Sequence, residues 1–311
     1  MQRQVCRLGA ERSFATSRDD LRELLGVCLS AETLRTVSEQ HGRQMAAWQP
    51  HDTSSVEVFQ AAEGAVEFTV DAGKVHTIEA GWKDLKIAVL QKRPLGEPAT
   101  VAQWDEQRLP EATARLAWGE IAPSKRFRRR WRGWLRRVGV QQAAEVHVLA
   151  DGAEWIWRSA DRVLTGSLQT LDIYHALGHV AQAAGALYGE GSEAAELFRA
   201  RGRDALLREG WVGLCRLVAQ EYAVGETPER RAALERLVGY FVKHTTRLDY
   251  AERLRSGRAI GSGCVEGQAK TLGLRLKARG ARWKMQNVRS MTALVCIHTS
   301  DQWEAYWTQA A

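Results

Sequence analysis

Hydrophobic and polar positions alternate in the first part of the chain and follow helical spacing in most of the rest. Residues 66–71 (Val-Glu-Phe-Thr-Val-Asp) alternate, 75–79 is a second such run, and 82–90 is a third. Short glycine turns separate the three runs. Period-two alternation is typical of half-buried strands. We therefore predict three antiparallel strands, with Asp71 at the end of the first. The polar segment 48–63 before them is predicted to be a connector.

Residues 1–47 are predicted to be helical. Ser17 and Ser30 each begin an amphipathic run, in the position of a capping serine. Two short helices in this place could form a small helix-turn-helix that binds DNA. An ordinary helical hairpin packed on the next domain is an equally simple interpretation.

The middle of the chain returns to helical spacing. We predict a very basic helix over 110–139, in which eight of the fourteen residues from Ser124 to Arg137 are Lys or Arg. Phe127, Trp131 and Trp134 interrupt this basic segment. It is predicted to hold the backbone of a nucleic acid, while a solvated charged helix face is the alternative.

A buried strand is predicted over 145–150, leading directly into Asp151, and 163–171 suits a short strand or loop. A helix opens at Leu171-Asp172, and the chain is then almost continuously helical to about residue 255. Breaks are expected near Gly189, Gly210 and 225–228. The last two predicted helices are 265–279 and 285–298.

Composition narrows the class of protein. The 311 residues are 45% hydrophobic and 26% charged, which is typical of a soluble globular protein with a core. The formal charge of +7 favours an anionic partner. Five scattered cysteines without a Cys-x-x-Cys pair argue against a zinc ribbon and a disulfide framework. No apolar run approaches the roughly 20 residues of a membrane span, and no signal peptide is visible, so we expect a cytoplasmic protein without a membrane partner.

One acid stands in strongly basic surroundings. Between Arg253 and Lys284 there are nine Lys and Arg and a single acid, Glu266, which follows a glycine turn (Gly-Ser-Gly-Cys-Val-Glu). With Asp71 and Asp151 at strand ends, it could complete a carboxylate site at one edge of a sheet. Two Mg²⁺ ions ~4 Å apart, held by such carboxylates, support phosphoryl transfer. Each acid also has a structural alternative: a hairpin turn for Asp71, a tight turn for Asp151 and a favourable helix-dipole position for Glu266.

Asp172 and His175 form a second polar pair. Both lie at the start of a predicted helix, with His179 one turn further along. They could ligate a metal, contact DNA or position Asp151. The structural alternative is a pair of polar residues that close a core helix.

Together these stretches resemble the DDE-class transposases of bacterial insertion sequences, and within them the Lre/Kra-type group. The resemblance rests on Val70-Asp71-Ala-Gly-Lys, Leu149-Ala-Asp151-Gly, Leu171-Asp-Ile-Tyr-His175 and segment 240–250. It is most specific in Ile260-Gly-Ser-Gly-Cys-Val-Glu266 followed by segment 275–283. The chain departs from that pattern in Asp-Ala-Gly, where Asp-Gly is expected, and in lacking the cysteine-rich N-terminal region of many members.

The resemblance implies an α/β fold, in which an RNase H-like mixed sheet is flanked by helices and a large all-helical insertion precedes the last catalytic acid. The expected divisions are an N-terminal helical region (1–50), the first part of the core (64–175), the insertion (176–255) and the C-terminal core helices (256–311).

The resemblance also implies an activity and its site. Asp71, Asp151 and Glu266 would be the catalytic, metal-binding triad, with Asp172 and His175 in support and Mg²⁺, or Mn²⁺, as the cofactor. The partner would be double-stranded DNA, both element ends and target, cut and rejoined by a homodimer associated with the bacterial nucleoid. The residues expected to contact DNA are Lys125, Arg126, Arg128, Arg129, Arg130, Arg132, Lys270, Arg275, Lys277 and Arg282. Two alternatives stay open: a metal-dependent nuclease without strand transfer, and a truncated, inactive transposase that only binds DNA.

Overall fold

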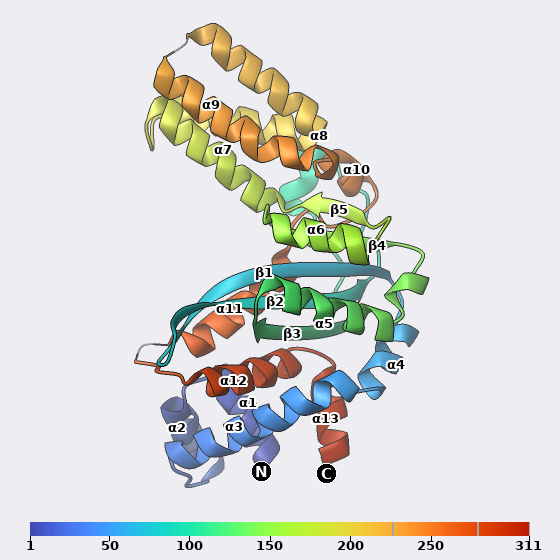
Figure 1. Ribbon diagram of the computed structural model, residues 1–311, viewed down its shortest axis with the longest axis vertical. Coiled ribbons are helices and arrows are strands. Elements are labelled where there is room, and N and C mark those ends of the chain that lie inside the picture. Colours follow the sequence, from blue (N-terminus) through green and yellow to red (C-terminus); the bar gives the residue numbers. More distant parts are fainter. Residues whose placement is uncertain (226, 279, 311) are drawn as a thin grey trace. The chain divides into compact units, whose positions relative to one another are not determined.

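The computed structural model describes residues 1–225, 227–278 and 280–310. Its strands form one mixed sheet in the order β3-β2-β1-β4-β5 (Figure 1). The first three pair antiparallel, whereas β4 and β5 are parallel. The strands are β1 (Ala65–Thr77), β2 (Gly81–Arg93), β3 (Ala114–Ile121), β4 (Val146–Ala150) and β5 (Leu168–Leu171). A mixed sheet flanked by helices, with a helical block before Glu266, confirms the predicted fold class.

Contacts between residues divide the chain into two compact units. Unit 1 contains residues 1–93 and 112–146 and the chain from Gly263 onward; unit 2 contains 94–111 and 147–262. The helices of unit 1 are α1 (Gln2–Glu11), α2 (Phe14–Leu25), α3 (Ala31–Trp48), α4 (Ser54–Ala61), α5 (Ser124–Arg137), α11 (Gly263–Leu276), α12 (Met285–His298) and α13 (Gln302–Ala310). The helices of unit 2 are α6 (Glu154–Val163), α7 (Ile173–Tyr188), α8 (Glu193–Val224), α9 (Pro228–Phe241) and α10 (Tyr250–Arg255).

Alternation along β1, β2 and β3 gives unit 1 two buried sheet faces. Leu85, Ile87 and Val89 of β2 point to one face, where they join a core with residues of α11 and α12. The other face carries Phe68 and Trp118, which pack against the aromatic side chains of α5. Helices therefore cover this part of the sheet on both sides (Figure 1).

The strand prediction was wrong at Asp71. One continuous strand, β1, replaces the two predicted runs, and Asp71 lies in its middle, paired with Ile87. The Ala-Gly-Lys sequence after Asp71 stays extended, because its backbone is held in the ladder with β2. The reversal comes later, before Gly81, which has a positive φ of 64°.

Two further predictions were wrong. Residues 114–121 form strand β3 and not the start of a helix, since pairing with β2 outweighs the helix propensity of Ala and Leu. The basic helix begins only at Ser124, after Pro123. The polar segment predicted as a connector contains helix α4.

The N-terminal helices agree with prediction, apart from one cap. Ser30 caps α3 by accepting a hydrogen bond from the Thr33 amide, but Ser13, not Ser17, caps α2. Helix α3 packs closely on α12 through Gly42. A Cβ at this glycine would lie 2.7 Å from the carbonyl carbon of Ser290.

Helices α7, α8 and α9 form the predicted helical block of unit 2. Breaks occur at Gly189 and at Gly210, which has a φ of 56°, as predicted. The third predicted break, 225–228, includes residue 226, outside the described residues. The side chain of Glu221 is fully buried between α8 and its neighbours and pairs with Arg201 and Arg230, each at 3.0 Å. Within the described residues, no helix has the length and apolar character needed to span a membrane.

Candidate carboxylate and metal site

Asp71 lies on the face of β1 that α11 covers. Its register partner, Ile87, belongs to the core formed with α11 and α12, so Asp71 projects to the same side. Two positions earlier on this face, Thr69 Oγ1 lies 2.9 Å from Cys264 Sγ at the start of α11. Glu266 follows in the first turn of that helix. Unit 1 thus places two of the three predicted acids near one β1–α11 contact.

Asp151 directly follows β4, as predicted, at the first position of a tight turn. Its Oδ1 accepts a hydrogen bond from the Ala153 amide at 2.9 Å, and its backbone carbonyl accepts one from Trp157 Nε1 at 2.8 Å. A Cβ at the next residue, Gly152, would lie 2.7 Å from Tyr240 Cζ. Tyr240 therefore packs directly on the turn, and any larger residue at position 152 would have to displace its side chain.

Asp172 is fully buried and forms a structural clamp. One carboxylate oxygen accepts a hydrogen bond from the His175 amide at 2.8 Å, which caps α7. The other accepts two from Ser262, one from its amide and one from its hydroxyl. The Ile173 amide also donates to the Ile260 carbonyl at 3.0 Å. The segment that precedes α11 is thus fastened to the start of α7.

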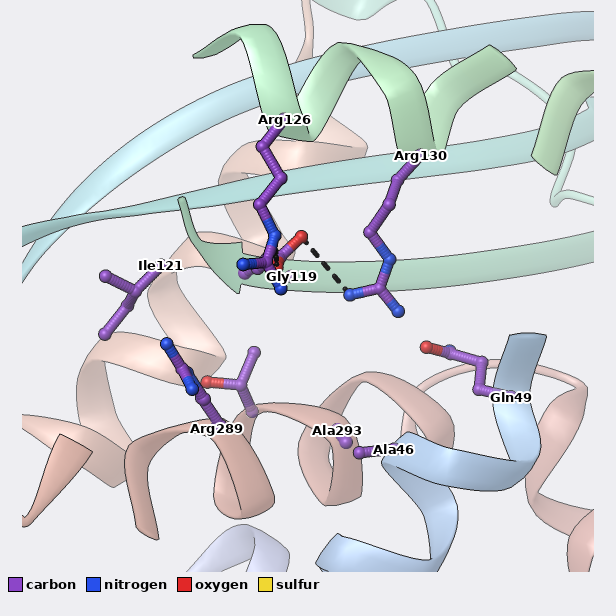
Figure 2. A pocket seen from close by; sticks show the side chains of 10 residues that line it. Ala46, Gln49, Gly119, Ile121, Arg126, Arg130, Arg289 and Ala293 are labelled. Carbon is purple, nitrogen blue, oxygen red and sulfur yellow. Dashed lines mark ion pairs between the residues drawn. The ribbon is translucent and has the colours of Figure 1, made fainter. Parts of the chain in front are cut away.

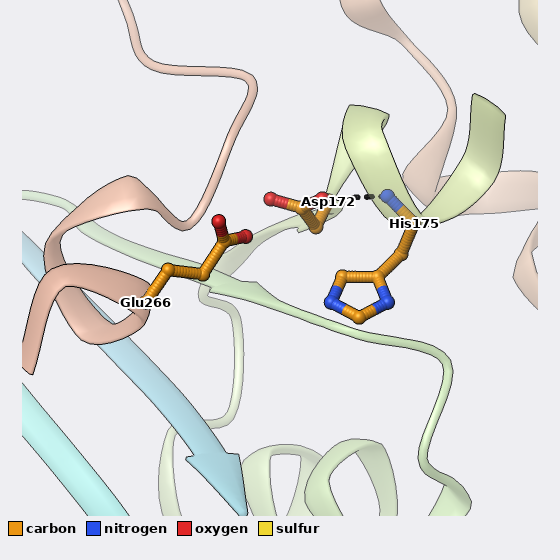
Figure 3. A group of neighbouring side chains, drawn as sticks. All are labelled: Asp172, His175 and Glu266. Carbon is orange, nitrogen blue, oxygen red and sulfur yellow. Dashed lines mark hydrogen bonds between the residues drawn. The ribbon is translucent and has the colours of Figure 1, made fainter. Parts of the chain in front are cut away.

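Two side chains at the start of α7 could contribute to a metal site. Asp172 and His175 offer a carboxylate oxygen and an imidazole nitrogen (Figure 3). Asp172 is buried and His175 is exposed, whereas Glu266, in unit 1, is half-buried.

Sequence reasoning missed that Tyr240 and His244 form an aromatic and histidine cluster with His179 beside Asp151. Tyr240 stacks on His179 with ring centroids 3.5 Å apart, and His244 lies 5.3 Å from the same tyrosine. Burial, with the negative charges of Asp151 and Asp172, raises the pKa of Tyr240 well above its usual value. Burial, then the charges of Arg247, Lys243 and His179, lowers the pKa of His244 to about 4. Segment 240–250 was already part of the resemblance. The spacing of its residues could not show that Tyr240 packs on Gly152.

Some of the residues predicted to contact DNA are exposed, and others are half-buried or form ion pairs within the protein. On α5, Lys125, Arg129 and Arg132 are exposed, whereas the aromatic residues of the helix are buried. Arg126 and Arg130 pair with Glu120 at 3.0 and 3.3 Å, and Arg128 is half-buried. Lys270, Lys277 and Arg282 are exposed on or after α11.

Arg275 does not fit the DNA-contacting role. Its side chain is 3% exposed and its Nε donates to the Gly9 carbonyl at 2.5 Å. The guanidinium lies over Phe14 and Trp283, with centroid distances of 4.3 and 5.1 Å. Burial lowers the pKa of Arg275 to about 10. This arginine joins α11 to the N-terminal helices; residue 279 of the same predicted segment lies outside the described residues.

Comparison with known proteins gives a likeness in structure but none in sequence. No protein-family model matches the chain, and no curated protein matches it. Among solved structures, the chain is similar to a Drosophila P element transposase strand transfer complex, with 10% identity and a TM-score of 0.40. The match covers 80% of this chain and 81% of that one.

Proposed function

We propose that this protein is a DDE-class transposase that cuts and rejoins DNA at the ends of its own element. The observation that carries the proposal is the placement of the acids in the sheet. Asp71 lies on the face of β1 that α11 covers, Glu266 lies in the first turn of α11, and Asp151 directly follows β4. Membership of the Lre/Kra-type group of bacterial insertion sequences, and a place at the nucleoid, belong to the same proposal.

The donor set fits a hard divalent cation. Carboxylate oxygens suit Mg²⁺ and Mn²⁺ alike. Asp71, Asp151 and Glu266 would hold the ions, and Asp172 would position Glu266 through Ser262. When bound, such ions activate an attacking oxygen and stabilise the leaving one.

The proposed reaction has two steps on phosphodiesters. Water attacks the phosphodiester at an element end and releases a 3′-hydroxyl. That hydroxyl then attacks a phosphodiester of the target DNA, so one bond forms as another breaks. The exposed cations predicted to contact DNA on these helices, Lys125, Arg129 and Arg132 of α5 and Lys270 of α11, hold the negatively charged backbones. Because two element ends must be paired, we propose a homodimer as the active form.

An isosteric variant tests the proposal. Asp151→Asn in the full chain is expected to abolish Mg²⁺-dependent cleavage of DNA that carries the element ends, while binding to that DNA is kept. Asp204→Asn is the matched control, because Asp204 is an exposed residue of α8 that pairs with Arg208 on the same helix. Cleavage by the Asp151→Asn protein at the unchanged rate would refute the assignment.

The products separate the alternative functions. Joined products identify a transposase, and cleavage without joined products identifies a nuclease that uses the same acids. DNA binding without any metal-dependent cleavage identifies a protein that only binds DNA.

A further inference from the structure

A basic cavity lies at the open edge of the sheet in unit 1. Its volume is about 150 Å³, and it is bounded by the end of β3, by α5 and by residues of α3 and α12. The charged residues that line it are Glu120, Arg126, Arg130 and Arg289. Figure 2 shows Arg126 and Arg130 extending from α5 and Arg289 extending from α12 into the same region. The proposed catalytic acids do not line this cavity.

Positive charge in the cavity exceeds negative charge. Glu120 pairs with both Arg126 and Arg130. Arg289 has no ion-pair partner within the part of the chain that the structure describes. Three guanidinium groups therefore face one carboxylate, which leaves a formal charge of about +2 on the lining. An anion in the cavity would therefore meet guanidinium groups from both α5 and α12.

A buried hydroxyl in the lining lacks a partner. Thr292 is 1% exposed, and its Oγ1 has no hydrogen-bond partner among the described residues. A buried hydroxyl without a partner costs roughly 1–3 kcal/mol. A ligand oxygen in the cavity would give Thr292 Oγ1 an acceptor and remove that cost.

The β3 backbone offers a further donor. On the open side of this edge strand, Arg115 exchanges hydrogen bonds with Asp301 through both its amide and its carbonyl. Gln49 Nε2 donates to the Ala117 carbonyl at 2.9 Å. Along an edge strand, the backbone groups of every second residue point away from the neighbouring strand. The amide of Gly119, two residues after Ala117, therefore points into the cavity that Gly119 lines.

We propose that the cavity lined by Arg126, Arg130, Arg289 and Thr292 binds a phosphate group. A tetrahedral oxyanion accepts hydrogen bonds from several directions, which matches guanidinium groups that arrive from two helices. A cavity of this size elsewhere holds a molecule as large as benzene, so a phosphate group has room. This site goes beyond the proposed strand transfer, because binding here needs none of the catalytic acids.

Binding of inorganic phosphate to the full protein tests the proposal. The melting temperature is measured in rising phosphate at constant ionic strength, with chloride and acetate as comparison anions. Phosphate is expected to raise the melting temperature more than the other two. In Arg289→Gln this response is expected to disappear. In Arg136→Gln, a matched loss of charge at an exposed α5 residue outside the cavity, it is expected to persist.

Thr292→Val gives a second test that does not depend on charge. Valine has nearly the same shape, and the lost hydroxyl has no partner in the free protein, so the free variant is expected to be at least as stable. Its affinity for phosphate is expected to fall about tenfold. An unchanged phosphate affinity in Thr292→Val would remove this hydroxyl from the site.

A DNA titration distinguishes a phosphate of the DNA backbone from a free phosphate ion. If the group belongs to DNA, Arg289→Gln lowers the slope of log affinity against log salt by about one, and a short duplex displaces phosphate. If the ion is free, the variant loses the phosphate response while DNA binding stays the same. The proposal is overturned if neither the phosphate response nor the salt slope separates Arg289→Gln from Arg136→Gln. Because no cleavage is measured, this outcome is independent of the catalytic assignment.

Discussion

Ser262 donates two hydrogen bonds to one carboxylate oxygen of Asp172, although the two residues are 90 positions apart. The amide nitrogen lies 2.5 Å and the hydroxyl oxygen 2.9 Å from Asp172 Oδ2. The same carboxylate caps α7 through its other oxygen. One buried side chain thus fixes both the start of a helix and the turn that leads to Glu266.

Asp172→Ala is expected to lower the free energy of unfolding by roughly 2–4 kcal/mol, because three buried donors lose their acceptor. Urea denaturation measures the change. Asp249→Ala is the matched control, since Asp249 also precedes a helix but makes no capping hydrogen bond. A loss of stability no larger than that of Asp249→Ala would show that the clamp contributes nothing.

Gly42→Ala is expected to destabilise the protein by about 1–3 kcal/mol, because the new methyl group would meet the Ser290 carbonyl of α12. Gly133→Ala on α5 is the control. Its Cβ would meet nothing within 4 Å, so helix propensity alone raises stability by about 0.5–1 kcal/mol. Melting curves of the two variants should shift in opposite directions; shifts of the same sign would contradict the close contact between α3 and α12.

Buried His147 makes stability depend on pH. Burial, then the charges of Arg253 and Arg258, lowers its pKa from 6.5 to about 3. As the pH falls, His147 is therefore protonated in the unfolded chain at a higher pH than in the folded protein. The stability that neutral His147 contributes is lost as the pH falls from about 6.5 towards 3. Between pH 7 and pH 5 we expect His147 to account for roughly 2 kcal/mol of lost stability.

His147→Gln should flatten this part of the pH profile, and glutamine can still bond the Thr170 hydroxyl that His147 Nε2 contacts at 2.8 Å. His51→Gln, a change at an exposed histidine, should leave the slope as it is. The measurement is urea unfolding at several pH values. Equal slopes in the two variants would show that His147 is not held neutral by the fold.

The exposed cations of α5 are expected to contact DNA phosphates. Replacing Arg129 and Arg132 by Gln should reduce the slope of log affinity against log salt by about two. Arg275→Gln should leave this slope unchanged and instead lower the melting temperature, because Arg275 is buried against Phe14 and Trp283. Binding titrations at four or five salt concentrations check both outcomes. If Arg275→Gln changed the slope as much, its assignment as a structural residue would be wrong.

The sequence predicted helices better than it predicted the edges of the sheet. Ser30, Gly189 and Gly210 act locally, as a cap and as breaks, so their effect was visible without the fold. Strand β3 was missed because its Ala- and Leu-rich sequence becomes a strand only through pairing with β2. The turn after Asp71 was predicted from Ala-Gly-Lys, but the ladder with β2 keeps those residues extended.

The candidate site shows the same limit. Asp151 and Glu266 lie at the strand end and helix start that were predicted, since both positions follow from local pattern. That Asp172 binds Ser262, that Tyr240 covers Gly152 and that Arg275 is buried are all consequences of long-range packing. Spacing along the chain carries no information about such contacts, and the expectation that Arg275 contacts DNA, which the resemblance implied, did not anticipate its burial.

The core of unit 1 contains residues from both the early and the late parts of the sequence. Its buried residues include Cys6 and Met45 near one end and Leu272, Met291 and Leu294 near the other. During synthesis the earlier strands would leave the ribosome long before α11 and α12 exist to cover them. A nascent chain halted at residue 262 is therefore expected to display a bare apolar sheet surface and to need chaperone protection, which pull-down of stalled ribosomes would reveal.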